Sequence, residues 1–248
     1  MLPFDPNNPS EGLKQTPNSQ RSTPQPLCSI CKMPMVYDPD QDVCGAVCAM
    51  TLHEERLGRI NDRLPEWLSA MGVPSRYSTD FPLPAPVRKF LARGDSILFQ
   101  GPTGTGKTTT MVSVIRELLR ERALSTSKTP EKYAFKFVNY NEFFFDAQDV
   151  FRTEHDRILD YLRPIARSEY LFIDDLGKKR VTEFVRDALY YVIEQRDANK
   201  RPTYVTTNLS VADIEHAFDA SISSRLMGMC QVVKFGGQDY RLAKRAGL

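Results

Sequence analysis

The residues with the most specific chemistry occupy one short loop. Residues 101–108 read GPTGTGKT and fit the phosphate-binding pattern G-x-x-x-x-G-K-[ST] at every fixed position. Glycines here let successive backbone N–H groups turn toward a phosphate, and the helix that follows directs its positive end at the same anion. We expect Lys107 to reach the β- and γ-phosphates and the Thr108 hydroxyl to hold Mg²⁺. The loop predicts binding of a nucleoside triphosphate by Gly101, Pro102, Thr103, Gly104, Thr105, Gly106, Lys107, Thr108 and Thr109.

The stretch at 170–177 supplies the acidic groups that such a site needs. It reads YLFIDDLG, an apolar strand pattern that ends in Asp174 and Asp175. Parallel sheets bind ligands at the carboxyl ends of their strands, next to a phosphate loop of this kind. We therefore expect Asp174 to bind Mg²⁺ through water, and Asp175 to orient or deprotonate the attacking water.

A polar amide follows another strand-like run. Residues 203–208 read TYVTTN, so Asn208 stands at the end of a β-rich stretch. An Asn in this place often caps the next helix, but Ser210 is the better cap for the helical pattern that begins at Val211. Asn208 is then left to hydrogen-bond the attacking water or the γ-phosphate.

These motifs need a scaffold of alternating strands and helices. From residue 87 onward, apolar β-rich runs alternate with helical patterns, which predicts an α/β fold with a parallel sheet sandwiched by helices. The predicted strands are 97–100, 134–138, 170–173, 203–206 and 231–235, and the predicted helices include 181–196 and 211–218.

Four of the five cysteines cluster near the N-terminus, as Cys28-x-x-Cys31 and Cys44-x-x-x-Cys48. In a reducing compartment, two such pairs are more typical of a metal site than of disulfides. If a helix begins near Cys44, then Cys44 and Cys48 lie one turn apart, so both thiolates can reach one ion. His53 is a rival fourth ligand, but it is rotated off that face. The pattern predicts a zinc site.

Composition bounds the remaining possibilities. The chain has 248 residues, 41% of them hydrophobic, and a net charge of +2, which is too small to indicate nucleic-acid binding by itself. No apolar run approaches the roughly 20 residues that span a bilayer, and the N-terminus lacks signal-peptide features. We expect a cytoplasmic protein with no membrane partner.

The sequence also predicts how the chain divides into domains. These are a disordered tail at 1–26, a zinc module at 27–66, a linker at 67–86 and a nucleotide domain at 87–248.

In order along the chain, the motifs GPTGTGKT, LFIDDLG, YVTTNLS, SSRL and GGQDYR resemble the AAA+ ATPases of the DnaC/DnaI helicase-loader and IstB transposition-helper group. The resemblance covers residues 67–248 and implies an AAA+ P-loop domain that hydrolyses ATP. It also implies that Arg225 is an arginine finger, which enters the nucleotide site of a neighbouring subunit. Arg241 would contact the γ-phosphate bound in its own subunit and so sense it. Many AAA+ proteins have Asp-Glu where this chain has Asp174 and Asp175, so we expect slow, assembly-stimulated hydrolysis.

The same resemblance implies partners. In this group the N-terminal part of bacterial loaders binds the hexameric replicative helicase, while the nucleotide domain binds single-stranded DNA and self-associates into a spiral. Cationic side chains suit DNA phosphates. Lys178, Lys179 and Arg180 follow the strand that ends in Asp174 and Asp175, and are the candidates for DNA binding.

Three hypotheses follow, from different functional classes. The first is an ATP-dependent loader that places a ring helicase on DNA, and the second is a transposition helper that coats target DNA and recruits a transposase. The third is an adaptor in which ATP only fixes the shape. The zinc module favours the loader over the helper, because helpers of the IstB type usually carry a helical N-terminal domain. The complete nucleotide site argues against the adaptor.

Overall fold

The structure is a computed structural model, and contacts divide its chain into two units, Met1–Glu55 and Arg56–Leu248. The residues that it describes are 27–33, 46–126, 134–153, 157–177, 181–237 and 239. The predicted tail at 1–26 lies outside the described residues. The larger unit carries the sheet.

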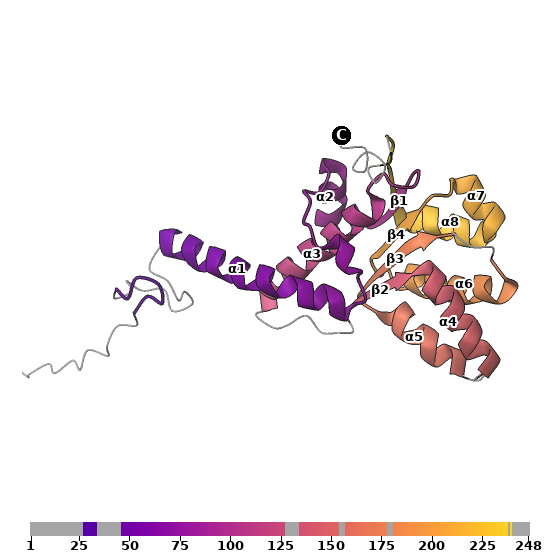
Figure 1. The fold of residues 1–248 in the computed structure, drawn as a ribbon, viewed down its shortest axis with the longest axis horizontal. Coiled ribbons are helices and arrows are strands. Elements are labelled where there is room, and N and C mark those ends of the chain that lie inside the picture. Colours follow the sequence, from indigo (N-terminus) through magenta and orange to yellow (C-terminus); the bar gives the residue numbers. More distant parts are fainter. Residues whose placement is uncertain are drawn as a thin grey trace, which may run out of the picture. The chain divides into compact units, whose positions relative to one another are not determined.

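Among the described residues, five parallel strands form one sheet, as the alternating pattern predicts (Figure 1). Their bounds are β1 Ser96–Gln100, β2 Phe135–Asn139, β3 Tyr170–Leu176, β4 Thr203–Thr207 and β5 Cys230–Lys234. The order across the sheet is β2-β3-β4-β1-β5, so β1 lies between β4 and β5 although it comes first in the chain. This crossover brings the loop after β1 to the same edge as the carboxyl ends of β3 and β4.

Helices cover both faces of the sheet. Those that the structure describes are α1 Ala46–Ala70, α2 Ala85–Ala92, α3 Lys107–Thr126, α4 Tyr140–Thr153, α5 Ile158–Arg167, α6 Glu183–Ala198, α7 Val211–Ala217 and α8 Ala220–Met229. On one face, α4 to α8 form an apolar core with Leu98 and Val205. On the other face, α2, α3 and the last part of α1 form a second core with Phe99 and Tyr204. The predicted sheet sandwiched by helices is confirmed.

The end of α1 belongs to the larger unit. Leu64 and Leu68 lie on one face of the helix, one turn apart, and both are buried in the core that α2 and α3 share. Val73, just after the helix, is buried in the same core. The sequence places these residues in a zinc module at 27–66 and a linker at 67–86. Contacts place the boundary between the two units after Glu55, within α1, and the apolar face of the helix packs in the core of the larger unit. The bounds of the zinc module and of the linker stay predictions.

A buried guanidinium fastens α6 to the turn before β4. Arg196 is fully buried, and it donates to the carbonyl oxygens of Ser168 at 2.8 Å and Pro202 at 2.6 Å, and to Oγ1 of Thr203 at 2.8 Å. Arg196→Met would leave these acceptors unpaired, so we expect the free energy of unfolding to fall by about 2–4 kcal/mol. Urea unfolding measures the loss. Arg186→Met, at a partly exposed position of the same helix, should change it by less than about 1 kcal/mol, and equal losses would contradict the role of Arg196.

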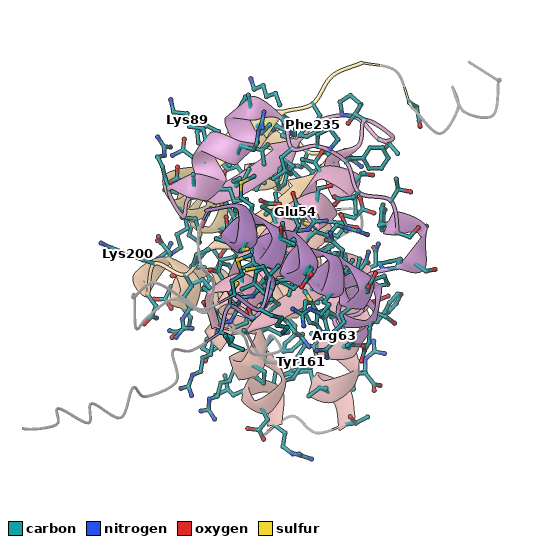
Figure 2. All side chains as sticks on the ribbon, turned by 90° about the vertical axis from the view of Figure 1, so that its left-hand side faces the viewer. Glu54, Arg63, Lys89, Tyr161, Lys200 and Phe235 are labelled. Atoms are coloured by element: carbon teal, nitrogen blue, oxygen red, sulfur yellow. The ribbon has the colours of Figure 1, made fainter. Side chains whose placement is uncertain are left out.

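Charged side chains are spread over the surface of the larger unit. Figure 2 shows Lys89 on α2 and Lys200 after α6 pointing outward, and both are exposed. Within the part of the chain that the structure describes, no helix is long and apolar enough to cross a membrane.

Candidate nucleotide-binding site

The phosphate loop lies where β1 passes into α3. β1 ends at Gln100, the residues GPTGTG form the turn, and α3 begins at Lys107. The backbone N–H of Gly101 donates to the carbonyl oxygen of Thr207 at 3.2 Å, which ties the loop to the end of β4. Gly104 has a φ of +80°, a conformation that favours glycine. The predicted strand, loop and helix are confirmed, and the loop ends at the N-terminus of a long helix, where anions bind.

Lys107 is buried within the loop, with 5% of its surface exposed. Its Nζ donates to the carbonyl oxygens of Gly101 at 2.8 Å and Pro102 at 2.7 Å, and to Oδ1 of Asn208 at 2.7 Å. Asn208 in turn donates from Nδ2 to Oγ1 of Thr103 at 3.3 Å. These contacts hold the ammonium in the loop, where it would meet a β- or γ-phosphate. The structure thus brings together two residues that the sequence assigns to one site.

Thr108 and Asp174 offer a pair of oxygen ligands. Oγ1 of Thr108 donates to Oδ1 of Asp174 at 2.7 Å, and Asp174 is buried. Hydroxyl and carboxylate oxygens are the ligands that Mg²⁺ prefers, and here they lie together beside the phosphate loop, so the pair fits the predicted magnesium role. Burial raises the pKa of Asp174 above its usual range, while the hydrogen bonds from Thr206 and Thr108 oppose that rise.

Asp175 occupies an irregular part of β3. Its φ is +59°, which is uncommon for a residue with a side chain. The ladder between β3 and β4 pairs Ile173 with Val205 and then Leu176 with Thr207, so β3 has one residue more than β4 between these pairs. Bulges of this kind redirect a side chain, and they occur often beside functional sites. The bulge gives Asp175 a direction that a regular strand would not allow, while its role as a base stays a prediction.

The helix after β4 begins as the sequence predicts. Oγ of Ser210 accepts from the backbone N–H of Asp213 at 3.1 Å, and the Asp213 carboxylate accepts from the backbone N–H of Ser210 at 3.1 Å. The two bonds form a capping box at the start of α7. Because Ser210 caps the helix, Asn208 is left to bind Lys107.

The segment after β5 runs across the phosphate loop. The backbone N–H of Phe235, labelled in Figure 2, donates to the carbonyl oxygen of Gln100 at 2.7 Å. A Cβ atom on Gly101 would overlap the carbonyl group of Phe235, and one on Gly104 would overlap the carboxylate of Asp239. Close packing against the backbone of Phe235 therefore requires a glycine at 101, whereas Gly104 is favoured by its φ of +80°, because the Asp239 side chain can move aside.

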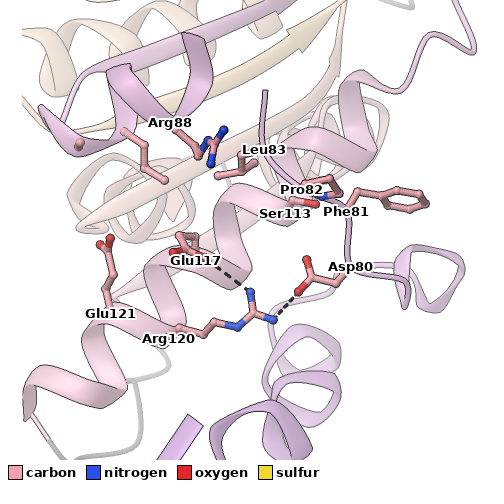
Figure 3. Close-up of a pocket in the computed structure, with 11 residues that line it drawn as sticks. Asp80, Phe81, Pro82, Leu83, Arg88, Ser113, Glu117, Arg120 and Glu121 are labelled. Carbon is pink, nitrogen blue, oxygen red and sulfur yellow. Dashed lines mark hydrogen bonds and ion pairs between the residues drawn. The ribbon is translucent and has the colours of Figure 1, made fainter. Parts of the chain in front are cut away.

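A hollow of 460 Å³ lies beside α3 (Figure 3). It is lined by residues 80–83, by α2 and by the middle of α3, and by no residue of the phosphate loop. Arg120 pairs with Asp80 and, at 3.6 Å, with Glu117, as Figure 3 shows. Among the described residues, Oγ of Ser113 is buried there without a hydrogen-bond partner. The hollow is separate from the nucleotide site.

Arg225 lies on α8 against α6. Its guanidinium carbon is 4.8 Å from the centroid of the Tyr190 ring, and Nη1 donates to the carbonyl oxygen of Ser221 at 3.2 Å. These contacts hold a half-buried side chain in place, while its role as a finger stays a prediction. Outside the described residues lie Arg241, Lys178, Lys179 and Arg180.

Three of the predicted zinc ligands lie together in the smaller unit. The sulfur atoms of Cys28, Cys31 and Cys48 all lie within 4.8 Å of one another. Thiolates on one tetrahedral zinc are roughly 3.8 Å apart, so the cluster can hold a metal with little adjustment. His53 is exposed and is not part of the cluster, whereas Cys44 lies outside the described residues.

The sheet, the phosphate loop and the buried lysine define a P-loop nucleotide-binding protein of the α/β class. The family model for IstB-like ATP binding proteins matches residues 86–247. The chain therefore belongs to the IstB-like ATP-binding family.

Relatives and a solved structure are similar to the same part of the chain. Phage-like element PBSX protein XkdC of Bacillus subtilis (strain 168) is 29% identical over 160 residues, which cover 62% of this chain and 55% of that protein. Rv3427c of Mycobacterium tuberculosis (strain ATCC 25618 / H37Rv), described as an ATP-binding protein in an insertion sequence, is 24% identical over 168 residues, covering 64% of this chain and 61% of that one. The match thus spans little more than half of each relative. The crystal structure of the DnaC helicase loader has a TM-score of 0.53 at 21% identity, over 66% of this chain and 100% of that one, and this likeness shows the fold.

One residue at the centre of the site, Thr206, was not predicted. It is fully buried, and its Oγ1 donates to Oδ1 of Asp174 at 2.7 Å. Thr206 ends the predicted strand 203–206, at the carboxyl ends of the strands, where Asp174 also lies. That place is the signal in the sequence that could have found it.

Proposed function

We propose that this chain is an ATP-dependent loader of a replicative helicase, and that it acts in the initiation of DNA replication. The observation that carries the proposal is a nucleotide site in one unit together with a cysteine cluster in a separate unit. The IstB-like domain would supply a switch driven by ATP, and the smaller unit would supply a docking element of its own. The similarity of the fold to the DnaC helicase loader supports this assignment.

The residues at the phosphate loop suit hydrolysis of ATP to ADP and phosphate. Lys107 would hold the β- and γ-phosphates, and Thr108 with Asp174 would hold Mg²⁺, which neutralises phosphate charge when bound. Asn208 would orient the attacking water, and Asp175 would accept its proton. Each of these side chains comes from the carboxyl edge of the sheet, from the segment just after a strand or from the start of α3.

Hydrolysis would depend on self-association. Arg225, held in place by Tyr190, would enter the site of a neighbouring subunit and stabilise the charge that develops on the phosphates. Asp175 is one methylene, about 1.5 Å, shorter than the Glu of many AAA+ proteins, so turnover would be slow. Such a site suits a switch that reports assembly better than a fast motor.

The smaller unit would bind the helicase. Zinc on Cys28, Cys31 and Cys48, with Cys44 as the predicted fourth ligand, would stabilise a unit that is too small to bury a large apolar core. The nucleotide domain would bind single-stranded DNA through cationic side chains. The candidates for these phosphate contacts are Lys178, Lys179 and Arg180.

Loading can be measured directly. The experiment mixes the intact chain with a circular single strand of DNA and the hexameric replicative helicase of the organism that supplies the chain. Gel filtration then measures how much helicase stays on the circle. The proposal predicts retention only when both the chain and ATP are present. Equal retention without the chain would refute it.

Cys28→Ser should release zinc and helicase together, because a hydroxyl is a much poorer zinc ligand than a thiolate. Elemental analysis should find about one zinc per chain in the wild type and less than about a tenth of that in the variant. ATP affinity should not change, since the nucleotide site lies in the other unit. Cys230→Ala, which removes a buried cysteine of the larger unit, is the matched control and should keep its zinc. Full zinc content in Cys28→Ser would remove this residue from the ligand set.

A transposition helper is the second candidate function. The similarity to Rv3427c, described as an ATP-binding protein in an insertion sequence, favours it. A helper would coat duplex target DNA and recruit a transposase, whereas a loader would prefer single strands. ATP-dependent binding to a duplex and to a single strand of the same length distinguishes them, and a strong duplex preference would count against the loader.

A further inference from the structure

A buried hydroxyl beside the end of β3 belongs to none of the roles assigned above. Thr206 lies on β4 and is fully buried. Its Oγ1 donates to Oδ1 of Asp174 at 2.7 Å, and the backbone N–H of Asp175 donates to the same Oγ1 at 2.9 Å. One hydroxyl therefore contacts both acidic residues of the site.

The bulge in β3 explains why a side chain is needed at this point. Between Ile173 and Leu176, β3 holds one residue more than the facing part of β4. A bulge interrupts the ladder and leaves a backbone group without its strand partner. Buried N–H groups need an acceptor, and Oγ1 of Thr206 accepts the N–H of Asp175. The hydroxyl thus stabilises the turn in which Asp175 has a φ of +59°.

The carboxylate of Asp174 is held from two sides. Thr108 on α3 and Thr206 on β4 both donate to its Oδ1, each at 2.7 Å. When Mg²⁺ binds, Thr108 would exchange its bond to the carboxylate for a bond to the metal. Thr206 can keep its bond, because it approaches from the sheet. Partners of this kind orient a metal-binding carboxylate.

We propose that Thr206 is a positioning residue of the nucleotide site, which orients Asp174 toward the metal and fixes the bulge that directs Asp175. It acts through the carboxylate of Asp174 and the backbone N–H of Asp175. The effect of Thr206 on Mg²⁺ binding requires only that the chain binds ATP. Its effect on Asp175 rests on the proposed ATP hydrolysis.

Thr206→Val keeps the shape of the side chain and removes the hydroxyl. In EDTA, the affinity for ATP should stay within about twofold of the wild type, because the phosphate loop is unchanged. The Mg²⁺ concentration that gives half of the magnesium-dependent gain in affinity should rise about 10-fold. The kcat for ATP hydrolysis should fall about 10- to 100-fold, while KM changes less than about threefold.

Thr203→Val is the matched control. Thr203 is also buried on β4, at the opposite end of the strand, and its hydroxyl accepts from Nε of Arg196. This variant loses a buried hydroxyl too, but its magnesium dependence and kcat should match the wild type. A general loss of packing would change both variants alike and would overturn the proposal.

Thr206→Ser and Thr206→Ala form a second pair of variants. This pair tests the role of the hydroxyl even if the valine variant does not fold. Both lack the methyl group, and only serine keeps the hydroxyl. Serine should restore the magnesium dependence and kcat, whereas alanine should not; equal behaviour of the two would overturn the proposal. If the wild type hydrolysed no ATP, the proposed ATPase function would fail, and the Mg²⁺ titration would still decide on Thr206.

Discussion

Lys107→Ala should reduce the affinity for ATP about 100-fold or more, and ATP hydrolysis should fall below detection. The ammonium is buried within the phosphate loop, so its hydrogen bonds to a phosphate would form away from bulk water. Each charge-assisted hydrogen bond of this kind contributes about 1.5–3 kcal/mol, and two of them account for the expected loss. Isothermal titration of Mg·ATP into the wild type and the variant measures the effect.

The same substitution removes bonds within the protein, so stability needs its own measurement. Nζ of Lys107 is the donor to the carbonyl oxygens of Gly101 and Pro102 and to Oδ1 of Asn208. We expect a modest fall in Tm without loss of the fold, which thermal unfolding checks. Lys136→Ala, at an exposed position of β2, is the control and should bind ATP like the wild type. Affinity within about twofold of the wild type in Lys107→Ala would contradict the site.

The local structure around the site that the sequence predicts correctly has local signals. The loop at 101–108 carries its glycines, lysine and threonine at fixed spacing, directly between an apolar run and a helical pattern. Ser210 and Asp213 have the spacing of a capping box, and recognising Ser210 as the cap is what leaves Asn208 for the site. The strands follow from their apolar runs, so the α/β class could be predicted as well.

The parts that were not predicted depend on contacts between segments far apart in the chain. The sequence assigns Lys107 and Asn208 to one site, but it does not predict the direct bond between them, which spans 101 positions. The bond from Thr206 to Asp174 spans 32 positions, and both bonds exist because β4 lies between β1 and β3. The bulge in β3 exists only relative to β4, so no pattern within one strand reveals it. The approach of Asp239 to the loop likewise depends on how the chain continues after β5.

Arg225→Ala should bind ATP like the wild type and lose nearly all of the hydrolysis that assembly stimulates, by about 1,000-fold. The described contacts of Arg225 are to Tyr190 and Ser221 of its own chain, and neither residue belongs to the phosphate loop. A guanidinium supplied by a neighbouring subunit would matter for the transition state but little for binding. ATPase rates measured over a range of protein concentrations show the stimulation. Arg225→Lys keeps the charge without the planar fork and should recover only a small part of it.

A mixture of two inactive variants decides whether Arg225 acts on a neighbouring subunit. Lys107→Ala lacks a working phosphate loop but keeps the finger, and Arg225→Ala lacks the finger but keeps the loop. Where a Lys107→Ala subunit presents Arg225 to the loop of an Arg225→Ala subunit, one complete site forms. The mixture should therefore hydrolyse ATP although neither variant does so alone. Wild-type stimulation in Arg225→Ala by itself would place the finger elsewhere, and an inactive mixture of variants that still assemble would show that Arg225 does not act between subunits.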